Sequence, residues 1–354
     1  MYVFTSRDVA RLAGVSQSTV SYVLSGKRTI SPRTRERVQA AIEQLTYQPN
    51  AGARALASRR TRVIAIVVAF GGTADGAGLL PFLETITQCA RERDHDVLLV
   101  AAQEGADALT RLDGRSQCDA VVLMEIEAED ERIAAISGLR IPVILIGVPN
   151  ASDRLHCVDV DFEEAGRLAV REVAETGRRR VAVIGYPPEA VRRDLNYVAR
   201  FQRGVDQAVA EARLDCELIA PVPATRAGAR DAVARVVSAG ERALRETGLI
   251  VPNTAAIQEV LRGLRAHGLA PGRDVPVVGV CTDAAAEAME PAVSNVSLEP
   301  RDVSRRAMRT LFALLENEQG THAGDRPRAR VQLVTPRLTR RETTAEALDA
   351  PAVQ

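Results

Sequence analysis

The chain lacks the residues and runs that mark several classes of protein. It contains no Trp, only 3% aromatic residues, and a single lysine, Lys27, among 46 basic side chains. Its five cysteines are odd in number and scattered, and its four histidines are equally dispersed. This spacing gives neither a disulfide framework nor a zinc-ligand cluster. We therefore expect reduced, mostly buried thiols, no metal site and no cofactor, as in a cytoplasmic protein.

Long apolar runs are also missing. The longest, residues 63–70, is too short to cross a bilayer, and the N-terminus has no signal-peptide pattern. We therefore expect a cytoplasmic protein with no membrane partner. The length of 354 residues and the apolar fraction of 46% suffice for two or three domains with a sizeable core.

The net charge of zero conceals an uneven distribution. Residues 1–62 hold eleven basic and three acidic side chains, whereas the rest of the chain holds 35 basic and 43 acidic ones. A basic segment joined to an acidic body is typical of a polyanion-binding module attached to one that does not bind polyanions. A basic face that is only solvated would give the same numbers of charged side chains, so the sequence motifs are needed to distinguish it from a polyanion-binding module.

Residues 3–26 predict two short helices joined by a tight turn. Thr5 and Asp8 fit the [ST]-x-x-[DE] capping box of a first helix, and Gly14 would end it with positive φ. Ser16 is suited to cap the second helix. A polar set at the start of such a helix is typical of a helix-turn-helix that reads the major groove, with a solvated α-hairpin as the alternative. The outward set comprises Gln17, Ser18, Ser21 and Tyr22.

A third helix is expected from Ser31-Pro32 to about Leu45, closing a three-helix unit. The first sixty residues resemble the headpiece of the LacI/GalR family of bacterial repressors. The resemblance is specific, because a chance helix-turn-helix would not carry the matching segment behind it. The matches are Asp8-Val9-Ala10, Ala13-Gly14-Val15-Ser16, Thr19-Val20-Ser21, Val23-Leu24, Gly26, Ile30-Ser31, Thr34-Arg35, Arg37-Val38, Ala41, Leu45, Tyr47-x-Pro49-Asn50 and Ala53-Arg54-x-Leu56.

The resemblance implies contacts between residues 1–46, the headpiece, and double-stranded DNA. Gln17, Ser18 and Tyr22 occupy base-reading positions, and their side chains can bond to base edges or touch a thymine methyl. Small hydroxyls near helix ends would contact phosphates without reading sequence. These are Thr5, Ser16, Thr19, Ser21, Ser25, Ser31 and Thr34, although Ser25 stands where the family usually has Asn.

Residues 47–61 are predicted to form a hinge helix behind the headpiece. It would be too short to be stable alone and should fold only on DNA or beside a partner copy. By resemblance, two hinge helices pair in the minor groove, where Leu56 wedges between base pairs and Ala53 permits close approach. A plain linker is the alternative. The implied minor-groove residues are Asn50, Ala53, Arg54 and Leu56.

From residue 62 onward, short β-rich runs alternate with amphipathic helical stretches, which predicts parallel sheets covered by helices. About 290 residues are too many for one such sheet, so we expect two Rossmann-like lobes. The predicted strands are Val63–Phe70, Asp96–Ala101, Ala120–Met124, Val143–Ile146, Val181–Ile184, Leu249–Val251 and Val275–Val280. The clearest predicted helices are Leu83–Arg93, Glu163–Thr176 and Tyr197–Ala212.

This region, residues 62–345, resembles the periplasmic-binding-protein type I fold, in which the chain crosses between lobes more than once. The expected N-lobe is about 62–160 and 292–322, the expected C-lobe is about 161–291 and 323–345, and 346–354 form a tail. Landmarks include Ile141-Pro142-Val143, Val158-x-Val160-Asp161, Ala165-Gly166, Gly177-x-x-x-Val181-Ala182-x-Ile184-Gly185, Arg200-x-x-x-Gly204, Val277-Val278-Gly279, Pro291 and Pro336-x-Leu338-x-x-Arg341.

An effector is expected in the crevice at the strands' carboxyl ends. The residues singled out are Arg200, Asn253, Phe82, Glu125, Tyr186 and Thr282, the first two by resemblance. The sequence departs from the family at two places. Thr254 follows Asn253, where many relatives carry an acid, and Gly279-Val280-Cys281-Thr282 stands where relatives often read Gly-Phe-Asp. The chain also has few aromatic residues, so the expectation of a sugar effector is weaker than family membership alone would make it. Two alternatives stay open: the effector is another small polar metabolite, or the pocket has lost its response to a ligand.

The sequence therefore predicts a dimeric, effector-controlled DNA-binding regulator, with a repressor expected and a tetramer left open. A DNA-binding regulator without an effector is the first alternative. A small-molecule-binding α/β protein or an enzyme is the second, but no nucleophile–base pair or metal cluster supports it.

Overall fold

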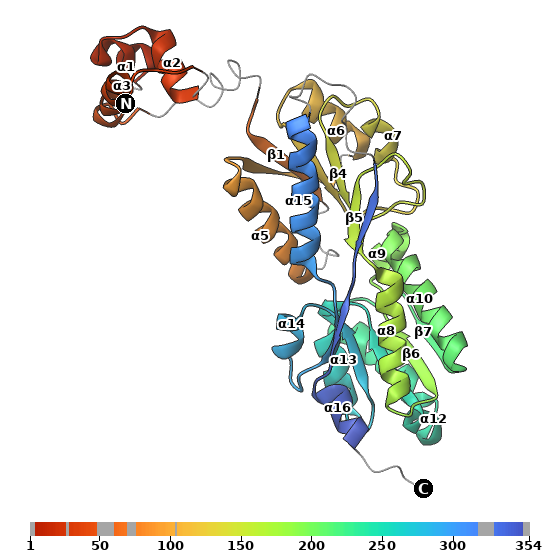
Figure 1. Ribbon diagram of the computed structural model, residues 1–354. Helices are drawn as coiled ribbons and strands as arrows, with labels where there is room; N and C mark the ends of the chain where they lie inside the picture. Colours follow the sequence, from red (N-terminus) through yellow and green to blue (C-terminus); the bar gives the residue numbers. More distant parts are fainter. Residues whose placement is uncertain are drawn as a thin grey trace. The chain divides into compact units, whose positions relative to one another are not determined.

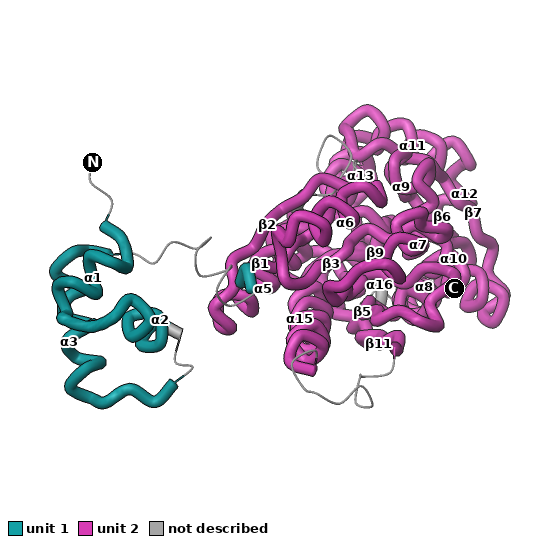
Figure 2. Tube along the Cα trace, turned by 90° about the horizontal axis from the view of Figure 1, so that it is seen from above, with its two compact units in different colours: residues 1–62 teal, residues 63–354 magenta. Residues whose placement is uncertain are grey.

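A computed structural model describes residues 4–25, 28–47, 60–68, 76–102, 105–317 and 329–349. The chain divides into two compact units, residues 1–62 and residues 63–354, and each is described by itself (Figure 2). We call them the headpiece unit and the core. Among the described helices, none combines the length and apolar character needed to span a membrane.

The headpiece unit contains three helices packed around small apolar side chains (Figure 1). They are α1 (Ser6–Ala13), α2 (Gln17–Ser25) and α3 (Pro32–Gln44). Val9, Val20 and Val38 contribute one fully buried side chain from each helix. Partly buried Tyr47, the first residue of the predicted hinge, packs against the same cluster. The predicted three-helix unit is confirmed.

The N-lobe of the core is built on a sheet of six parallel strands in the order β11-β5-β4-β3-β1-β2. Helices α5 and α15 cover one face and α6 and α7 the other (Figure 1). Its strands are β1 (Val63–Val68), β2 (Asp96–Ala101), β3 (Ala120–Met124), β4 (Val143–Ile146), β5 (Cys157–Val160) and β11 (Val331–Val334). Its helices are α5 (Gly76–Glu92), α6 (Gly105–Gly114), α7 (Arg132–Ile136) and α15 (Pro300–Asn317).

The C-lobe has a second six-stranded sheet in the order β12-β10-β9-β8-β6-β7, in which only the short β12 runs antiparallel to its neighbour. Helices α8 and α10 pack on one face and α11 and α13 on the other. Its strands are β6 (Arg180–Ile184), β7 (Asp215–Ile219), β8 (Thr247–Val251), β9 (Val277–Val280), β10 (Ser294–Ser297) and β12 (Arg337–Thr339). Its helices are α8 (Phe162–Glu175), α9 (Pro188–Arg192), α10 (Asn196–Ala212), α11 (Arg226–Ser238), α12 (Glu241–Arg245), α13 (Thr254–Ala266), α14 (Asp283–Glu287) and α16 (Glu342–Asp349).

Helices α8 and α10 approach each other closely because glycines face each other across the contact. A Cβ atom on Gly204 would lie 1.9 Å from the carbonyl oxygen of Glu163, and one on Gly166 would lie 2.4 Å from that of Phe201. Only hydrogen fits in these positions. The contact fixes α10, and therefore Arg200 one turn before Gly204, against the start of α8.

The chain crosses between the lobes three times, but the expected boundaries are wrong at two strands. β10 lies within residues 292–322, which were assigned to the N-lobe, yet it pairs with β9 of the C-lobe. β11 lies within residues 323–345, which were assigned to the C-lobe, yet it pairs with β5 of the N-lobe. β10 is polar, and its Asn295 amide donates to the Cys281 carbonyl at 2.8 Å, so no apolar run marked the strand. Figure 1 shows β11 continuing into β12 across the third crossing.

The predicted tail of residues 346–354 is also too long. Helix α16 continues through residues 346–349, while residues 350–354 lie outside the described part of the chain. The helix is anchored by Thr343, whose hydroxyl donates to the Val277 carbonyl at 2.6 Å, and by Thr344, whose hydroxyl donates to Glu172 at 2.6 Å. These two buried threonines extend the fold beyond the point at which the apolar pattern ends.

Candidate DNA-reading surface and ligand cavity

Side-chain caps set the geometry of the helix-turn-helix. The Thr5 backbone amide and hydroxyl both donate to the Asp8 carboxylate, at 2.9 and 2.8 Å, and hold the pKa of that carboxyl below its usual value. Gly14 ends α1 with φ of 60° and ψ of 42°, the left-handed conformation that favours glycine. The predicted capping box and helix end are both confirmed.

The turn and the third helix are fixed in the same way. Ser16 accepts a hydrogen bond from the Thr19 amide at 3.1 Å, and Ser31 accepts one from the Thr34 amide at 3.3 Å, as helix caps do. Arg37 of α3 donates to the Gly14 carbonyl at 3.0 Å and also to that of Ala13. The end of α1 is therefore tied to α3, and α2 leaves the turn in a fixed direction.

The three predicted base-reading side chains are exposed on α2. The Gln17 amide donates to the Ser6 hydroxyl at 2.8 Å, and the hydroxyls of Ser18 and Ser16 are 2.8 Å apart. Tyr22 is 36% exposed, and the Arg28 guanidinium lies 5.8 Å from its ring centroid. The structure thus places the set on one helix with its polar groups accessible, which is what base readout requires.

The residues predicted to contact phosphates lie at the start of α1, in α2 with its cap, and at the start of α3. Thr5, Ser16, Ser21 and Ser31 are exposed, and Thr19 and Thr34 are half-buried. Ser25 is the last residue of α2, and its side chain is not among those that the structure describes. The predicted minor-groove residues Asn50, Ala53, Arg54 and Leu56 also lie outside the described residues.

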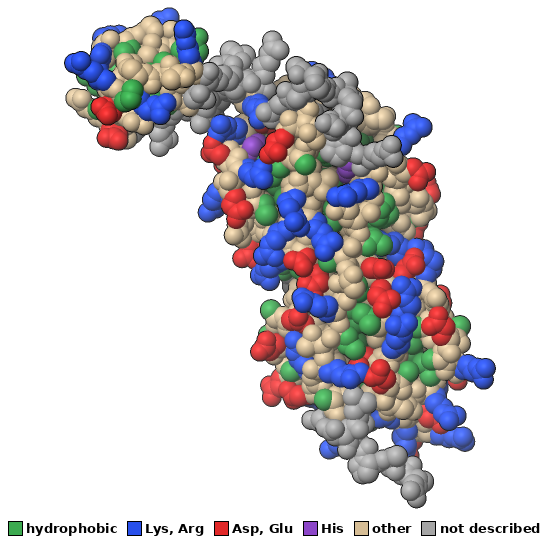
Figure 3. All heavy atoms as spheres, viewed as in Figure 1, with side chains coloured by type: hydrophobic (Ala, Val, Ile, Leu, Met, Phe, Trp, Pro, Cys, Tyr) green, Lys and Arg blue, Asp and Glu red, His purple; other side chains and the backbone are tan. Residues whose placement is uncertain are grey.

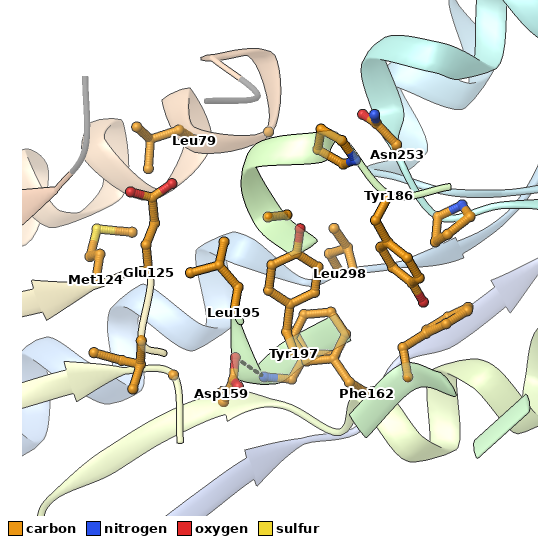
Figure 4. Close-up of a pocket in the computed structure, with 18 of the residues that line it drawn as sticks. Leu79, Met124, Glu125, Asp159, Phe162, Tyr186, Leu195, Tyr197, Asn253 and Leu298 are labelled. Carbon is orange, nitrogen blue, oxygen red and sulfur yellow. Dashed lines mark hydrogen bonds between the residues drawn. The ribbon is translucent and has the colours of Figure 1, made fainter. Parts of the chain in front are cut away.

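The core contains a cavity of about 540 Å³ between its two lobes. It brings together four of the six predicted effector residues, namely Phe82, Glu125, Tyr186 and Asn253. Figure 4 shows Leu79, Met124 and Glu125 on one side and Tyr186 and Asn253 on the other, with Tyr197 between them. Most of the wall is apolar, and the volume suits a small organic ligand.

Arg200 is not among the residues that line this cavity. Its guanidinium donates to Asp159 at 2.5 Å and to the Val160 carbonyl at 3.0 Å, and it lies 5.7 Å from the Phe162 ring centroid. Burial raises the pKa of the Asp159 carboxyl to about 6, although the charge and hydrogen bonds of Arg200 oppose the shift. Because Asp159 does line the cavity, Arg200 is placed to position that carboxylate and the cavity wall.

Thr282 is also absent from the wall. Its hydroxyl accepts from the Ala285 amide at 3.3 Å and so caps α14. The neighbouring Asp283 pairs with Arg341 at 3.4 Å and does not line the cavity either. Thr282, which was predicted to contact the effector, therefore has a local structural role in this chain.

Sequence reasoning missed an ionic link between the lobes. Arg193, which follows α9, donates to Glu127 at 2.9 Å and to Glu125 at 3.4 Å, and both acids follow β3 of the N-lobe. The backbone of Glu125 has φ of 52°, an unusual conformation for a residue other than glycine. Arg132 secures it by donating to the Glu125 carbonyl at 3.0 Å. Charged residues in loops gave no sequence signal for this arrangement.

Sequence reasoning also missed three of the aromatic rings on the wall, which belong to Phe162, Tyr197 and Phe201. The Phe162 and Tyr197 ring centroids are 5.3 Å apart, and Tyr186 lies 6.4 Å from both Tyr197 and Phe201. In a chain with few aromatic residues, the positions of two of them were a usable sequence signal. Phe162 directly precedes one predicted helix and Tyr197 begins another, and both helices follow predicted strands. No group of three His, Cys, Asp or Glu side chains in the described residues could hold a metal ion.

Comparisons with known proteins agree with this architecture. Residues 5–50 match the model of bacterial regulatory proteins of the lacI family, and residues 170–344 match a periplasmic binding protein-like domain. The chain is 30% identical over 334 residues to the HTH-type transcriptional regulator CelR of Thermobifida fusca, covering 87% of this chain and 90% of that one. It is 25% identical over 320 residues to catabolite control protein A of Priestia megaterium, with 89% and 93% covered.

Two solved structures are similar over nearly the whole chain. One is described as a transcriptional regulator CelR–cellobiose complex, with a TM-score of 0.65, 26% identity, and 96% of this chain and 99% of that chain covered. The other is a lac repressor dimer bound to operator and the anti-inducer ONPF, with a TM-score of 0.80, 20% identity, and 97% and 99% covered. At that lower identity, the second likeness shows the fold alone.

Proposed function

The chain belongs to the lacI family of bacterial regulatory proteins, and we propose from this that it is a repressor that binds a near-palindromic operator as a homodimer. The observation that carries the proposal is the capped helix-turn-helix, which presents Gln17, Ser18 and Tyr22 on the exposed side of α2. One such headpiece covers little DNA, so two copies are needed for specific binding. A tetramer is the alternative assembly.

The proposal includes control by a small molecule in the core cavity. Support comes from the cavity itself and from the similar CelR structure, which is described as a complex with cellobiose. The wall is built from both lobes, so an occupant would favour one relative position of the lobes over another. To change operator affinity, the effector must bind the free and DNA-bound states unequally.

We further propose that the protein acts in the cytoplasm and is not an enzyme. The named relatives are transcriptional regulators, which supports a regulatory role for the same fold. In that role the cavity needs only to bind its ligand reversibly.

Selection of bound sequences from random double-stranded DNA tests the DNA-binding part. Wild-type protein should enrich one near-palindromic motif, and Gln17→Ala should relax preference at a symmetric pair of positions within it. Gln39→Ala provides a matched control, because Gln39 is an exposed glutamine on α3. An identical motif from wild type and Gln17→Ala would remove Gln17 from base readout, and no motif at all would contradict the proposed function.

Thermal unfolding with a panel of metabolites tests the effector part, because a ligand that binds only the folded state stabilises it by mass action. A stabilising metabolite should also change operator affinity. If no metabolite stabilises the protein, a DNA-binding regulator without an effector becomes the better description.

A further inference from the structure

We propose that the effector is an uncharged molecule with an apolar, ring-containing body, and not a free sugar, a sugar phosphate or another anion. This inference rests on the proposed function, since it names the chemical class of the molecule that would occupy the core cavity. Four features of the wall lead to it: its aromatic residues, its unpartnered donors, its balance of charge and its apolar surface.

The first feature is a concentration of aromatic residues in a chain that has few. The protein contains eleven aromatic residues in total, six Phe and five Tyr. Of those that the structure describes, five line the cavity: Phe82, Phe162, Tyr186, Tyr197 and Phe201. Aromatic walls bury apolar area and pack well against other rings in offset or edge-to-face arrangements. A ligand with a ring of its own would use this surface.

The second feature is a pair of buried hydrogen-bond donors without partners in the described structure. Tyr186 and Asn253 are 1% and 5% exposed, yet the Tyr186 hydroxyl and the Asn253 side-chain nitrogen have no hydrogen-bond partner. The Asn253 oxygen is already engaged, because it accepts from the Ala255 amide at 3.2 Å and caps α13. An unpaired buried donor is costly, so a ligand acceptor such as a carbonyl oxygen would satisfy what the fold leaves open.

The third feature is that, among the described residues of the wall, every charged side chain already has a partner of opposite charge. Asp159 pairs with Arg200, Glu125 with Arg193, and Glu189 with Arg192. Arg193 also pairs with Glu127 at 2.9 Å. These groups comprise four carboxylates and three guanidinium groups. An anionic ligand would therefore meet an excess of negative charge and would have to break an existing ion pair to reach a cation.

The fourth feature is the apolar remainder of the wall. A sugar placed here would turn many of its hydroxyls towards hydrocarbon, and those hydroxyls would lose their hydrogen bonds to water without replacement. Glu125 differs from this background, since its carboxylate extends towards Leu79 on the N-lobe side (Figure 4). It can accept one hydrogen bond from a hydroxyl at the far end of a ligand. The apolar residues include Leu79, Met124, Ile126, Ile146, Val148, Leu195, Val280 and Leu298.

Three two-ring probes separate the ligand classes. 4-Hydroxybenzophenone is an uncharged two-ring molecule with a carbonyl acceptor and a hydroxyl donor; 4-benzoylbenzoate has the same body with a carboxylate; cellobiose has two sugar rings. Thermal unfolding of the full chain is measured with each probe. We expect 4-hydroxybenzophenone to raise the unfolding temperature more than either of the others. A shift with cellobiose or 4-benzoylbenzoate that equals or exceeds it would overturn the proposal.

Two variants connect the shift to the unpartnered donors. Tyr186→Phe removes the hydroxyl, and Asn253→Ser removes the side-chain nitrogen while keeping an oxygen that can cap α13. Both should reduce the shift caused by 4-hydroxybenzophenone, whereas Cys216→Ser, at an exposed position on β7, should leave it unchanged. An undiminished shift in both variants would contradict the assigned donors.

The ligand-free variants decide the case in which no probe shifts the wild type. Without ligand, Tyr186→Phe should unfold at the same temperature as wild type or higher, because the lost hydroxyl has no partner to lose. A clearly lower unfolding temperature would show that the hydroxyl stabilises the fold, and would overturn the proposal.

Operator binding is followed in the same samples. A probe that stabilises the protein but leaves operator affinity unchanged would support the proposed ligand class. It would contradict only the proposed control of DNA binding by the effector.

Discussion

Single side chains at the start of α2 are already hydrogen-bonded in the absence of DNA. Gln17 donates to Ser6, and the hydroxyl of Ser16 lies 2.8 Å from those of both Ser18 and Thr19. Reading a base therefore exchanges one hydrogen bond for another, so the net gain for each correct contact is small. Specificity then depends mainly on the penalty at a wrong base, where a polar group is left without a partner.

Ser16→Ala should destabilise α2 by about 1 kcal/mol, because it removes the oxygen that accepts from the Thr19 amide at 3.1 Å. Hydrogen exchange of the α2 amides in the full chain measures the loss. Ser21→Ala is the matched control, since Ser21 is exposed within the same helix and should change exchange little. Equal protection in Ser16→Ala and wild type would remove Ser16 as the cap.

The burial of the Asp159 carboxyl predicts a pH dependence of stability. Burial raises the folded-state pKa of Asp159 from 3.8 to about 6, so the folded state retains a proton that the unfolded state has released. This proton contributes about 3 kcal/mol to the free energy of unfolding. The contribution is fully present below pH 3.8 and is lost as pH rises to about 6. The stability of wild type relative to Asp159→Asn should therefore fall across this window and level off above it.

Chemical unfolding of both proteins at a series of pH values measures the difference. A relative stability that rises between pH 4 and pH 6 would show that attraction to Arg200 outweighs burial. The pKa of Asp159 would then lie below its usual value.

At the scale of helices and strands, the apolar runs located the central strands well. β2, β3 and β4 have the predicted bounds, because buried parallel strands are continuous apolar runs. β10 was missed because its Ser and Asn residues are buried through hydrogen bonds, as at Ser294, whose hydroxyl donates to the Arg341 carbonyl at 3.0 Å. β7 and β11 were missed because they form the edges of their sheets and contain exposed residues, so neither strand is a continuous apolar run.

The close contact of α8 and α10 gives a prediction at this scale. Gly204→Ala should destabilise the core by at least about 1–3 kcal/mol, since the new methyl group would meet the Glu163 backbone and force the helices apart. Gly114→Ala at the end of α6 is the control, because its Cβ would meet nothing within 4 Å. Urea unfolding measures both, and equal midpoints for the two variants would contradict the contact.

For the whole molecule, charge and the family motifs predicted the division into a basic headpiece and an acidic core. Figure 3 shows basic and acidic side chains interspersed over the face of the core in view. The cavity was predicted only in part, because its wall is assembled from strand ends, loops and helices between residues 78 and 298. Resemblance placed Asn253 correctly on the wall but did not anticipate that Arg200 would turn towards Asp159. Such contacts depend on tertiary packing, which local sequence patterns do not encode.

The measurement that tests the account most directly is recovery of genomic DNA fragments bound by the purified protein at a low and a high salt concentration. A sequence-specific dimer should enrich a shared near-palindrome that survives at high salt, while non-specific fragments bound through phosphate contacts are lost. Genes beside that motif would then indicate which uncharged, ring-containing metabolites to test in the cavity. Fragments without a common motif, all released at high salt, would contradict the account and leave the headpiece as a non-specific anchor.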